Sequence, residues 1–188
     1  NVFEDCKSLE QITFKSSIES IGYDSFKECS SLKQISIQPS VKTIKRGAFQ
    51  NCSSLVEIEI PSSITKIENF VFEGCSSLKQ IKIPSTVNSI EEYAFKGCSS
   101  LEDIQIPESV TRINDYVFCG CSSLKQIKIP KTVEETGDYS FSGCSSLKQV
   151  SISLSVKGIG EYFFNGCSSL EEIEIPSSVT QIGSYAFS

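Results

Sequence analysis

The chain has 188 residues, of which 39% are hydrophobic and 21% charged, and its net charge is −6 at pH 7. This length and composition suit a single soluble domain with a sizeable core. They argue against a nucleic-acid-binding surface, because acids outnumber interspersed bases, and against a membrane helix, because no apolar run approaches roughly 18 residues.

One 23-residue sequence pattern is repeated eight times without an insertion. Phe, Cys and Leu mark it, recurring in steps of 23 from Phe3, Cys6 and Leu9. We number the copies from their Phe: residues 3–25, 26–48, 49–71, 72–94, 95–117, 118–140, 141–163 and 164–186. A fixed period predicts a solenoid, in which stacked copies bury together what one copy cannot bury alone. We expect residues 1–188 to form one such array, excised from a longer one with both ends inside a repeat.

Each copy begins with a turn and continues into a short strand, as copy four illustrates. Gly74 precedes the cysteine, and other copies have Gly, Asn or Asp there, which is typical of a left-handed backbone. In 78–83, isoleucine alternates with polar residues, the pattern of a strand with one buried face. Pro84 lacks an N–H group for a sheet and ends that strand. We therefore expect a parallel sheet along one face of the solenoid.

The second half of each copy closes the coil. Val87 and Ile90 supply two more buried positions, and Tyr93-Ala94-Phe95 turns the chain back toward the next copy. Local departures from the repeat pattern occur at Thr136 and at Ser153-Leu154, and none of them alters the expected fold class. That class is a β-rich solenoid with short strands and turns opposite its main sheet.

The stretch 170–187, LEEIEIPSSVTQIGSYAF, shows the whole pattern almost without departure. This pattern resembles the BspA-like class of 23-residue leucine-rich repeats, also called the Treponema pallidum type, and the resemblance covers the whole chain. It implies a leucine-rich repeat superhelix. It further implies a surface protein of a host-associated bacterium or parasitic protist that adheres to host surface or matrix proteins.

The alternative function is an intracellular, cytoplasmic scaffold for protein–protein interactions. Nine cysteines that look reduced favour this alternative, because disulfides are rare in the cytosol. An enzyme is not expected, since the chain has no histidine and no recognisable catalytic set. We predict no cofactor, no nucleic-acid partner and no membrane insertion by this segment, and end-to-end self-association through exposed end repeats.

Eight of the nine cysteines form a ladder with one thiol per copy. Metal sites need cysteines that converge on one point, so no metal is predicted. Neighbouring copies are close enough for disulfides, but equivalent side chains point in parallel rather than toward one another. We expect buried, reduced thiols that act as small hydrophobic side chains.

Cys119 is the odd cysteine, since the segments 72–84 and 118–130 differ only by Glu73 and Cys119. Equivalent positions in the other copies are all polar, so we predict a free surface thiol. Its presence is explained either by neutral drift or by an intermolecular disulfide or redox role.

An aromatic stripe precedes the buried Phe by two residues from copy three onward: Phe70, Tyr93, Tyr116, Tyr139, Tyr162 and Tyr185. We expect these rings to stack and stabilise the coil. The alternative is a ligand-binding strip, because tyrosine is enriched at contact surfaces.

The predicted partner-binding residues lie in copies six to eight. Acidic and basic strands alternate along the sheet until two lysine strands meet near Lys125 and Lys148, and Leu154 stands where other copies are mostly Ser. Phe163 replaces a small residue in the same copy. An apolar anchor rimmed by charge is typical of a contact patch. The predicted set is Lys125, Lys128, Lys148, Leu154, Glu171, Glu172 and Glu174.

Overall fold

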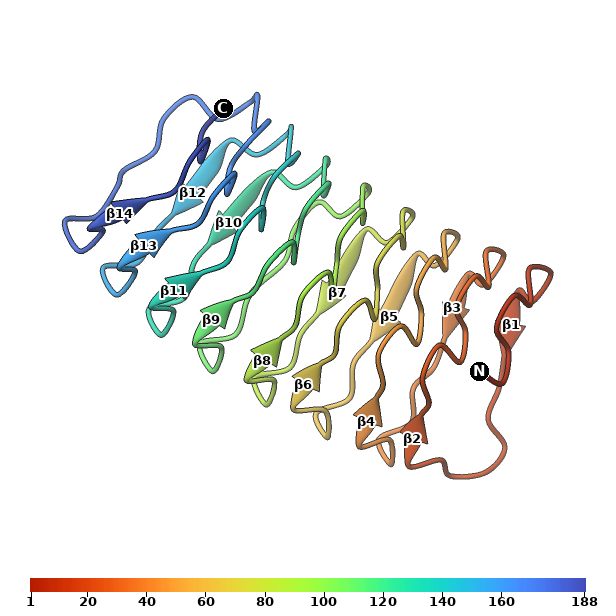
Figure 1. Ribbon diagram of the computed structural model, residues 1–188. Helices are drawn as coiled ribbons and strands as arrows, with labels where there is room; N and C mark the ends of the chain where they lie inside the picture. Colours follow the sequence, from red (N-terminus) through yellow and green to blue (C-terminus); the bar gives the residue numbers. More distant parts are fainter.

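The computed structural model describes all of residues 1–188 as a row of stacked coils with fourteen short strands and no helix (Figure 1). Two rows of strands run the length of the molecule. The first sheet face contains β1 (Gln11–Ile12), β3 (Gln34–Ile35), β5 (Glu57–Glu59), β7 (Gln80–Lys82), β10 (Gln126–Lys128) and β12 (Gln149–Ser151). The second sheet face contains β2 (Ser20–Ile21), β4 (Thr43–Ile44), β6 (Lys66–Ile67), β8 (Ser89–Ile90), β9 (Arg112–Ile113), β11 (Glu135–Thr136), β13 (Gly158–Ile159) and β14 (Gln181–Ile182).

Every strand pair is parallel and in the register set by the repeat. On the first sheet face, β1, β3, β5 and β7 form one sheet, in which Ile35 pairs with Ile12 and with Ile58. A second sheet joins β10 and β12. The expected solenoid and its parallel sheet are confirmed, and each 23-residue copy forms one coil of the solenoid.

The first sheet face differs from the expected continuous sheet in two places. Copy five forms no strand on this face; it joins copy four through an isolated bridge between Gln80 and Asp103 and a backbone hydrogen bond from Glu102 N to Lys79 O. Residues 171–175 of copy eight form no strand, and no backbone hydrogen bond joins them to β12. The strands of copies one to four therefore form one continuous hydrogen-bonded sheet, whereas copy eight is not part of a sheet on this face.

The core is a stack of identical layers. The nine Phe rings of the repeat, from Phe3 to Phe187, follow one another at centroid distances of 5.2–5.8 Å. From copy two to copy seven these rings are at most 2% exposed, and the Leu and Ile side chains of each copy lie beside them. Burial of such side chains contributes about 1.5–3 kcal/mol each, and each aromatic pair adds about 0.5–1.5 kcal/mol.

Hydroxyl groups connect neighbouring copies at two corners of the coil. From copy three onward, the serine after the cysteine donates to the carbonyl of its counterpart one copy earlier, as Ser76 Oγ does to Ser53 O at 3.4 Å. At the other corner, Thr86 Oγ1 donates to Ile64 O at 2.8 Å, and equivalent residues repeat this bond through copy seven. Ser178 Oγ of copy eight is the one buried side-chain oxygen or nitrogen atom without a hydrogen-bond partner.

Candidate interaction surface

The outward side chains of the first sheet face surround a shallow hollow of about 870 Å³ over copies one to five. One row of side chains forms its floor: Gln11, Gln34, Glu57, Gln80 and Asp103. A second row lies beside it: Thr13, Ser36, Glu59, Lys82 and Gln105. The short side chains of Thr13 and Ser36 help to create the hollow, because most later copies carry longer residues in that row.

A third row, the rim, precedes the floor row by one residue and is largely neutralised by its own ion pairs. Lys33 Nζ lies 2.8 Å from Glu10 Oε2, and Lys125 Nζ lies 2.5 Å from Glu102 Oε2. The hydrogen bond from each lysine lowers the pKa of its glutamate partner below the usual value. The rim therefore holds charge of both signs, paired between copies one and two and between copies five and six, whereas Lys79 of copy four forms no ion pair.

The two lysines that meet on the rim in copies six and seven differ in their pairing. Lys125 turns toward Glu102 of copy five, because each strand has a neighbour on both sides and the acidic one attracts the ammonium group. Lys148 forms no ion pair. Lys128 lies 4.0 Å from Glu108, at the limit of an ion pair. The rim over copies six and seven therefore carries one free ammonium group.

The sequence predicted Leu154 and Phe163 to belong to one contact patch, but the two side chains lie in different environments. The Leu154 side chain is 76% exposed, as expected for a contact residue. Phe163 is 1% exposed and packs edge-on against Phe141 and Phe164, so its proposed role on the surface is wrong. Its neighbours one copy away, Ser140 and Ala186, are small and leave room for the ring.

The acidic residues predicted as a terminal strand are exposed but do not belong to the sheet. Glu171, Glu172 and Glu174 lie in the segment of copy eight that separates from β12. The contact role of Lys125, Lys128, Lys148, Leu154 and these three glutamates stays a prediction.

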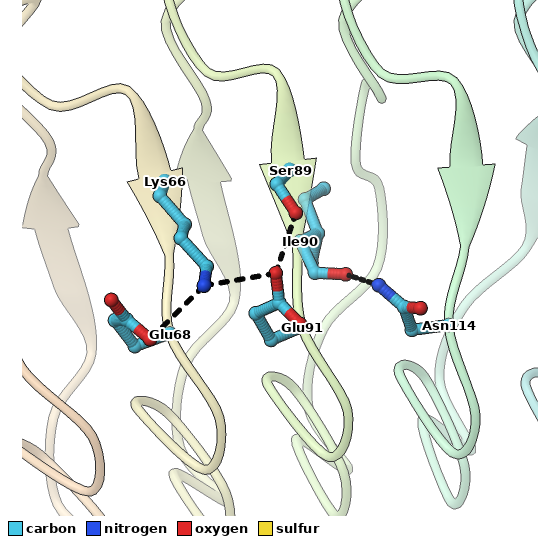
Figure 2. Close-up of polar contacts among 6 residues, drawn as sticks. All are labelled: Lys66, Glu68, Ser89, Ile90, Glu91 and Asn114. Carbon is cyan, nitrogen blue, oxygen red and sulfur yellow. Dashed lines mark hydrogen bonds and ion pairs between the residues drawn. The ribbon is translucent and has the colours of Figure 1, made fainter.

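On the second sheet face, polar side chains mainly contact one another, as Figure 2 shows at β6, β8 and β9. Lys66 Nζ lies 3.4 Å from Glu68 and 3.2 Å from Glu91, and Ser89 Oγ donates to Glu91 at 2.6 Å. Asn114 Nδ2 donates to Ile90 O at 2.8 Å, which joins copy five to copy four. We assign these contacts to the cohesion of the coils.

The aromatic stripe forms the predicted stack, with centroid distances of 4.5–4.9 Å from Phe70 to Tyr185. The Arg46 guanidinium lies 5.0 Å from the Phe70 centroid and covers the first ring. All six residues have a left-handed backbone, with φ between 52° and 62°. This conformation costs a non-glycine residue roughly 1–2 kcal/mol, which stacking offsets. The ring faces are occupied by one another, so a ligand would meet mainly ring edges.

Seven of the eight thiols in the ladder are buried, as expected, and Cys6 is not. All nine cysteines are free, and those from Cys29 to Cys167 in the ladder are buried. Each of these thiols lies within hydrogen-bonding distance of a Phe carbonyl of the preceding copy, for example Cys75 Sγ to Phe49 O at 3.2 Å. Burial raises the pKa of Cys75 and Cys167 to about 12. These thiols are therefore structural rather than nucleophilic.

Cys119 is half-buried rather than fully exposed, between Lys96 and Ser142 in its row. Partial burial raises the pKa of its thiol, while the Lys96 ammonium acts in the opposite direction. Cys6 in copy one is also half-buried. We therefore expect accessibility at two thiols, of which Cys119 was predicted from the sequence and Cys6 was not.

Labelling of the native protein with a maleimide is expected to modify Cys119 and Cys6 and to spare the seven buried thiols. Because the thiolate is the reactive form and the pKa of Cys119 is raised, the rate at Cys119 should increase with pH throughout the range in which the protein is folded. Peptide mass spectrometry after timed quenching measures each site, and a Cys119→Ser variant identifies its signal. Rapid labelling of any buried cysteine in folded protein would contradict the ladder.

The structure contains neither a cluster of metal-ligating side chains nor a helix that could span a membrane. No group of three or more His, Cys, Asp or Glu side chains is placed to hold a metal ion. No helix has the length and apolar character needed to span a bilayer.

Three comparisons place this architecture among known proteins. The model of the BspA type leucine-rich repeat region matches residues 1–122 and 89–188. A leucine-rich repeat protein from Bacteroides ovatus is 32% identical with a TM-score of 0.71, and the match covers 92% of this chain and 51% of that one. The T. pallidum leucine-rich repeat protein is 32% identical with a TM-score of 0.76, over 80% of this chain and 73% of that one.

A leucine-rich cell surface protein from Faecalibacterium prausnitzii is 26% identical with a TM-score of 0.51, over 96% of this chain and 64% of that one. The chain thus spans about half the length of the Bacteroides ovatus protein, at 51%. No curated protein matches the sequence.

Proposed function

The chain belongs to the BspA-type leucine-rich repeat family, and from this premise we propose that it is a non-enzymatic adhesion module at a cell surface. Leucine-rich repeat families are typically protein-interaction modules, and solenoids use extended concave surfaces for binding. The partners are proteins of a host surface or matrix. The cell-surface protein from Faecalibacterium prausnitzii supports this location for a relative of the same fold.

The observation that carries this proposal is the hollow on the first sheet face. Its floor presents polar side chains without ion pairs, whereas the rim and the second sheet face contain ion pairs between neighbouring copies. Unpaired polar groups in a shallow depression are available to a partner. The hydroxyls at the coil corners donate to neighbouring carbonyls, and the buried thiols have raised pKa values, so neither set supplies a nucleophile.

A second candidate is an intracellular scaffold, favoured by the nine free cysteines. Free thiols without disulfides suit a reducing compartment. Self-association through the ends of the array is a further proposal, and it is motivated by exposed apolar side chains such as Val2 and Tyr185.

Adhesion of host cells to beads coated with the protein tests the proposed function. We expect binding to cells and to at least one immobilised matrix protein, and roughly tenfold weaker binding for Glu57→Lys/Asp103→Lys, because like charges oppose a complementary partner. Thr180→Ser on the second sheet face is the matched control and should bind as the parent does.

A Lys148→Glu/Leu154→Ser variant tests the predicted patch in copies six to eight. Loss of adhesion in this variant alone would move the contact surface to the C-terminal copies. If the parent binds neither cells nor matrix proteins but captures a defined cytosolic protein, the scaffold function replaces adhesion.

A further inference from the structure

The hollow leaves a specific set of hydrogen-bonding groups free. Three of its five floor residues, Gln11, Gln34 and Gln80, are carboxamides with no hydrogen-bond partner in the chain. A carboxamide presents a donor and an acceptor together. It therefore matches a peptide group, which also offers one N–H and one C=O.

The lining of the hollow is acidic, and the rim beside it in copies one to five carries two ammonium groups and two carboxylates. Among its lining residues are the carboxylates of Glu57, Glu59 and Asp103 and the single ammonium group of Lys82. None of these four takes part in an ion pair within 4.0 Å, although Glu59 and Lys82 are direct neighbours across β5 and β7. Charge complementarity thus favours a cationic occupant.

The spacing of the floor carboxylates selects a backbone conformation for that occupant. Glu57 and Asp103 are two copies apart, about 9.5 Å for parallel strands separated by about 4.7–4.9 Å. A polyproline II segment places every third residue on one side at intervals of about 9.3 Å. A β-strand repeats a side after about 6.7 Å, which matches neither one copy nor two.

We propose that the hollow over copies one to five binds an extended, polyproline II-type peptide segment with basic residues three positions apart. The segment lies along the solenoid axis, with one basic side chain at Glu57 and Glu59 and the next at Asp103. Gln11, Gln34 and Gln80 hydrogen-bond its backbone, whose groups are unpaired in this conformation. This inference rests on the proposed function only in taking the hollow as the contact surface.

The test is fluorescence anisotropy with labelled peptides and the whole protein. The probe is a (Lys-Pro-Pro)₄ peptide. The comparison peptides are (Glu-Pro-Pro)₄ and a peptide of the same composition with its four lysines adjacent. We expect binding of the first peptide alone at low salt, and roughly fivefold weaker binding to Glu57→Gln/Asp103→Asn, because two exposed charge pairs contribute about 1 kcal/mol together.

The control variant is Glu134→Gln/Glu161→Gln, which removes the same charge outside the hollow and should leave the affinity within twofold. Equal loss in both variants would show general electrostatic attraction and overturn the inference, as would equal affinity for the adjacent-lysine peptide. If no peptide binds while the parent still adheres to cells through the hollow, the inference fails and the proposed function stands. If the parent binds the (Lys-Pro-Pro)₄ peptide but does not adhere to cells, the proposed function fails and the inference stands.

Discussion

Raising the pH from about 8 to about 10.5 is expected to unfold the protein cooperatively, because its buried thiols keep their protons only in the folded state. Burial raises the pKa of Cys75 to about 12, and raises those of Cys52, Cys98, Cys121 and Cys144 as well. In the unfolded chain a cysteine ionises near pH 8.5. The stability that these thiols contribute is therefore complete below about pH 8.5 and is lost as the pH rises toward their folded pKa values.

The expected effect is large because the repeat multiplies it. Each thiol costs about 1.4 kcal/mol of unfolding free energy per pH unit in this range, so five cost roughly 7 kcal/mol per unit. A stability of about 5–15 kcal/mol would be exhausted within one to two pH units. Circular dichroism during urea unfolding at several pH values, with a reductant present, measures the slope.

A Cys75→Ala/Cys98→Ala variant separates the thiols from other titrating groups. It should be less stable than the parent at pH 7, because buried volume is lost, but its stability should fall with pH less steeply by roughly 2.7 kcal/mol per unit. A slope equal to that of the parent would show that lysines or tyrosines, rather than the thiols, control alkaline unfolding.

The repeat period allowed the stacked features to be predicted from the sequence. Translation by 23 residues brings Phe49 over Phe72 and Cys52 over Cys75 whatever the details of the coil. For the same reason the tyrosine stack and the parallel register could be predicted. Any property that depends only on which residues are equivalent was accessible in this way.

Contacts between non-equivalent residues could not be predicted by that reasoning. Lys125 has Glu102 on one side and Lys148 on the other, and only the structure shows that its side chain turns to Glu102. Phe163 interrupts a series of small residues, and a substitution of this kind could point outward or inward. The space between Ser140 and Ala186 draws the ring into the core.

Two features that were not predicted, the left-handed backbone of the stacked aromatic residues and the hollow, do have a signal in the sequence. Asp24 and Gly47 occupy the positions equivalent to Tyr93, and both residue types tolerate a left-handed backbone, which all the stacked aromatics adopt. The hollow has its signal in Thr13 and Ser36, whose short side chains lower one row of the sheet. The irregular charge pattern, in contrast, lies at the opposite end of the array, in copies six to eight.

The Gly160→Ala substitution is expected to destabilise the protein by about 3 kcal/mol, which makes it the largest single-residue effect that we predict. A Cβ atom at this position would meet the backbone of Gly137 in the preceding copy, with the Gly137 carbonyl carbon at 2.7 Å. Backbone atoms cannot turn away as a flexible side chain can, so copies six and seven would have to separate. Overpacking of this kind costs about 1–3 kcal/mol or more. At about 2–4 °C per kcal/mol, calorimetry should show a melting temperature lower by roughly 6–12 °C.

Gly158→Ala, two residues earlier in β13, is the matched control. A Cβ atom there would approach only the Gln181 carbonyl oxygen, at 4.0 Å, and the backbone is not left-handed. Replacing such a glycine restricts mainly the unfolded chain, so the variant should be as stable as the parent or more stable by about 0.4–1 kcal/mol. The opposite signs follow from the short distance between adjacent coils at this corner, which the glycines at 137, 160 and 183 permit. Equal melting temperatures for the two variants would mean that the coils are not packed backbone to backbone at Gly160.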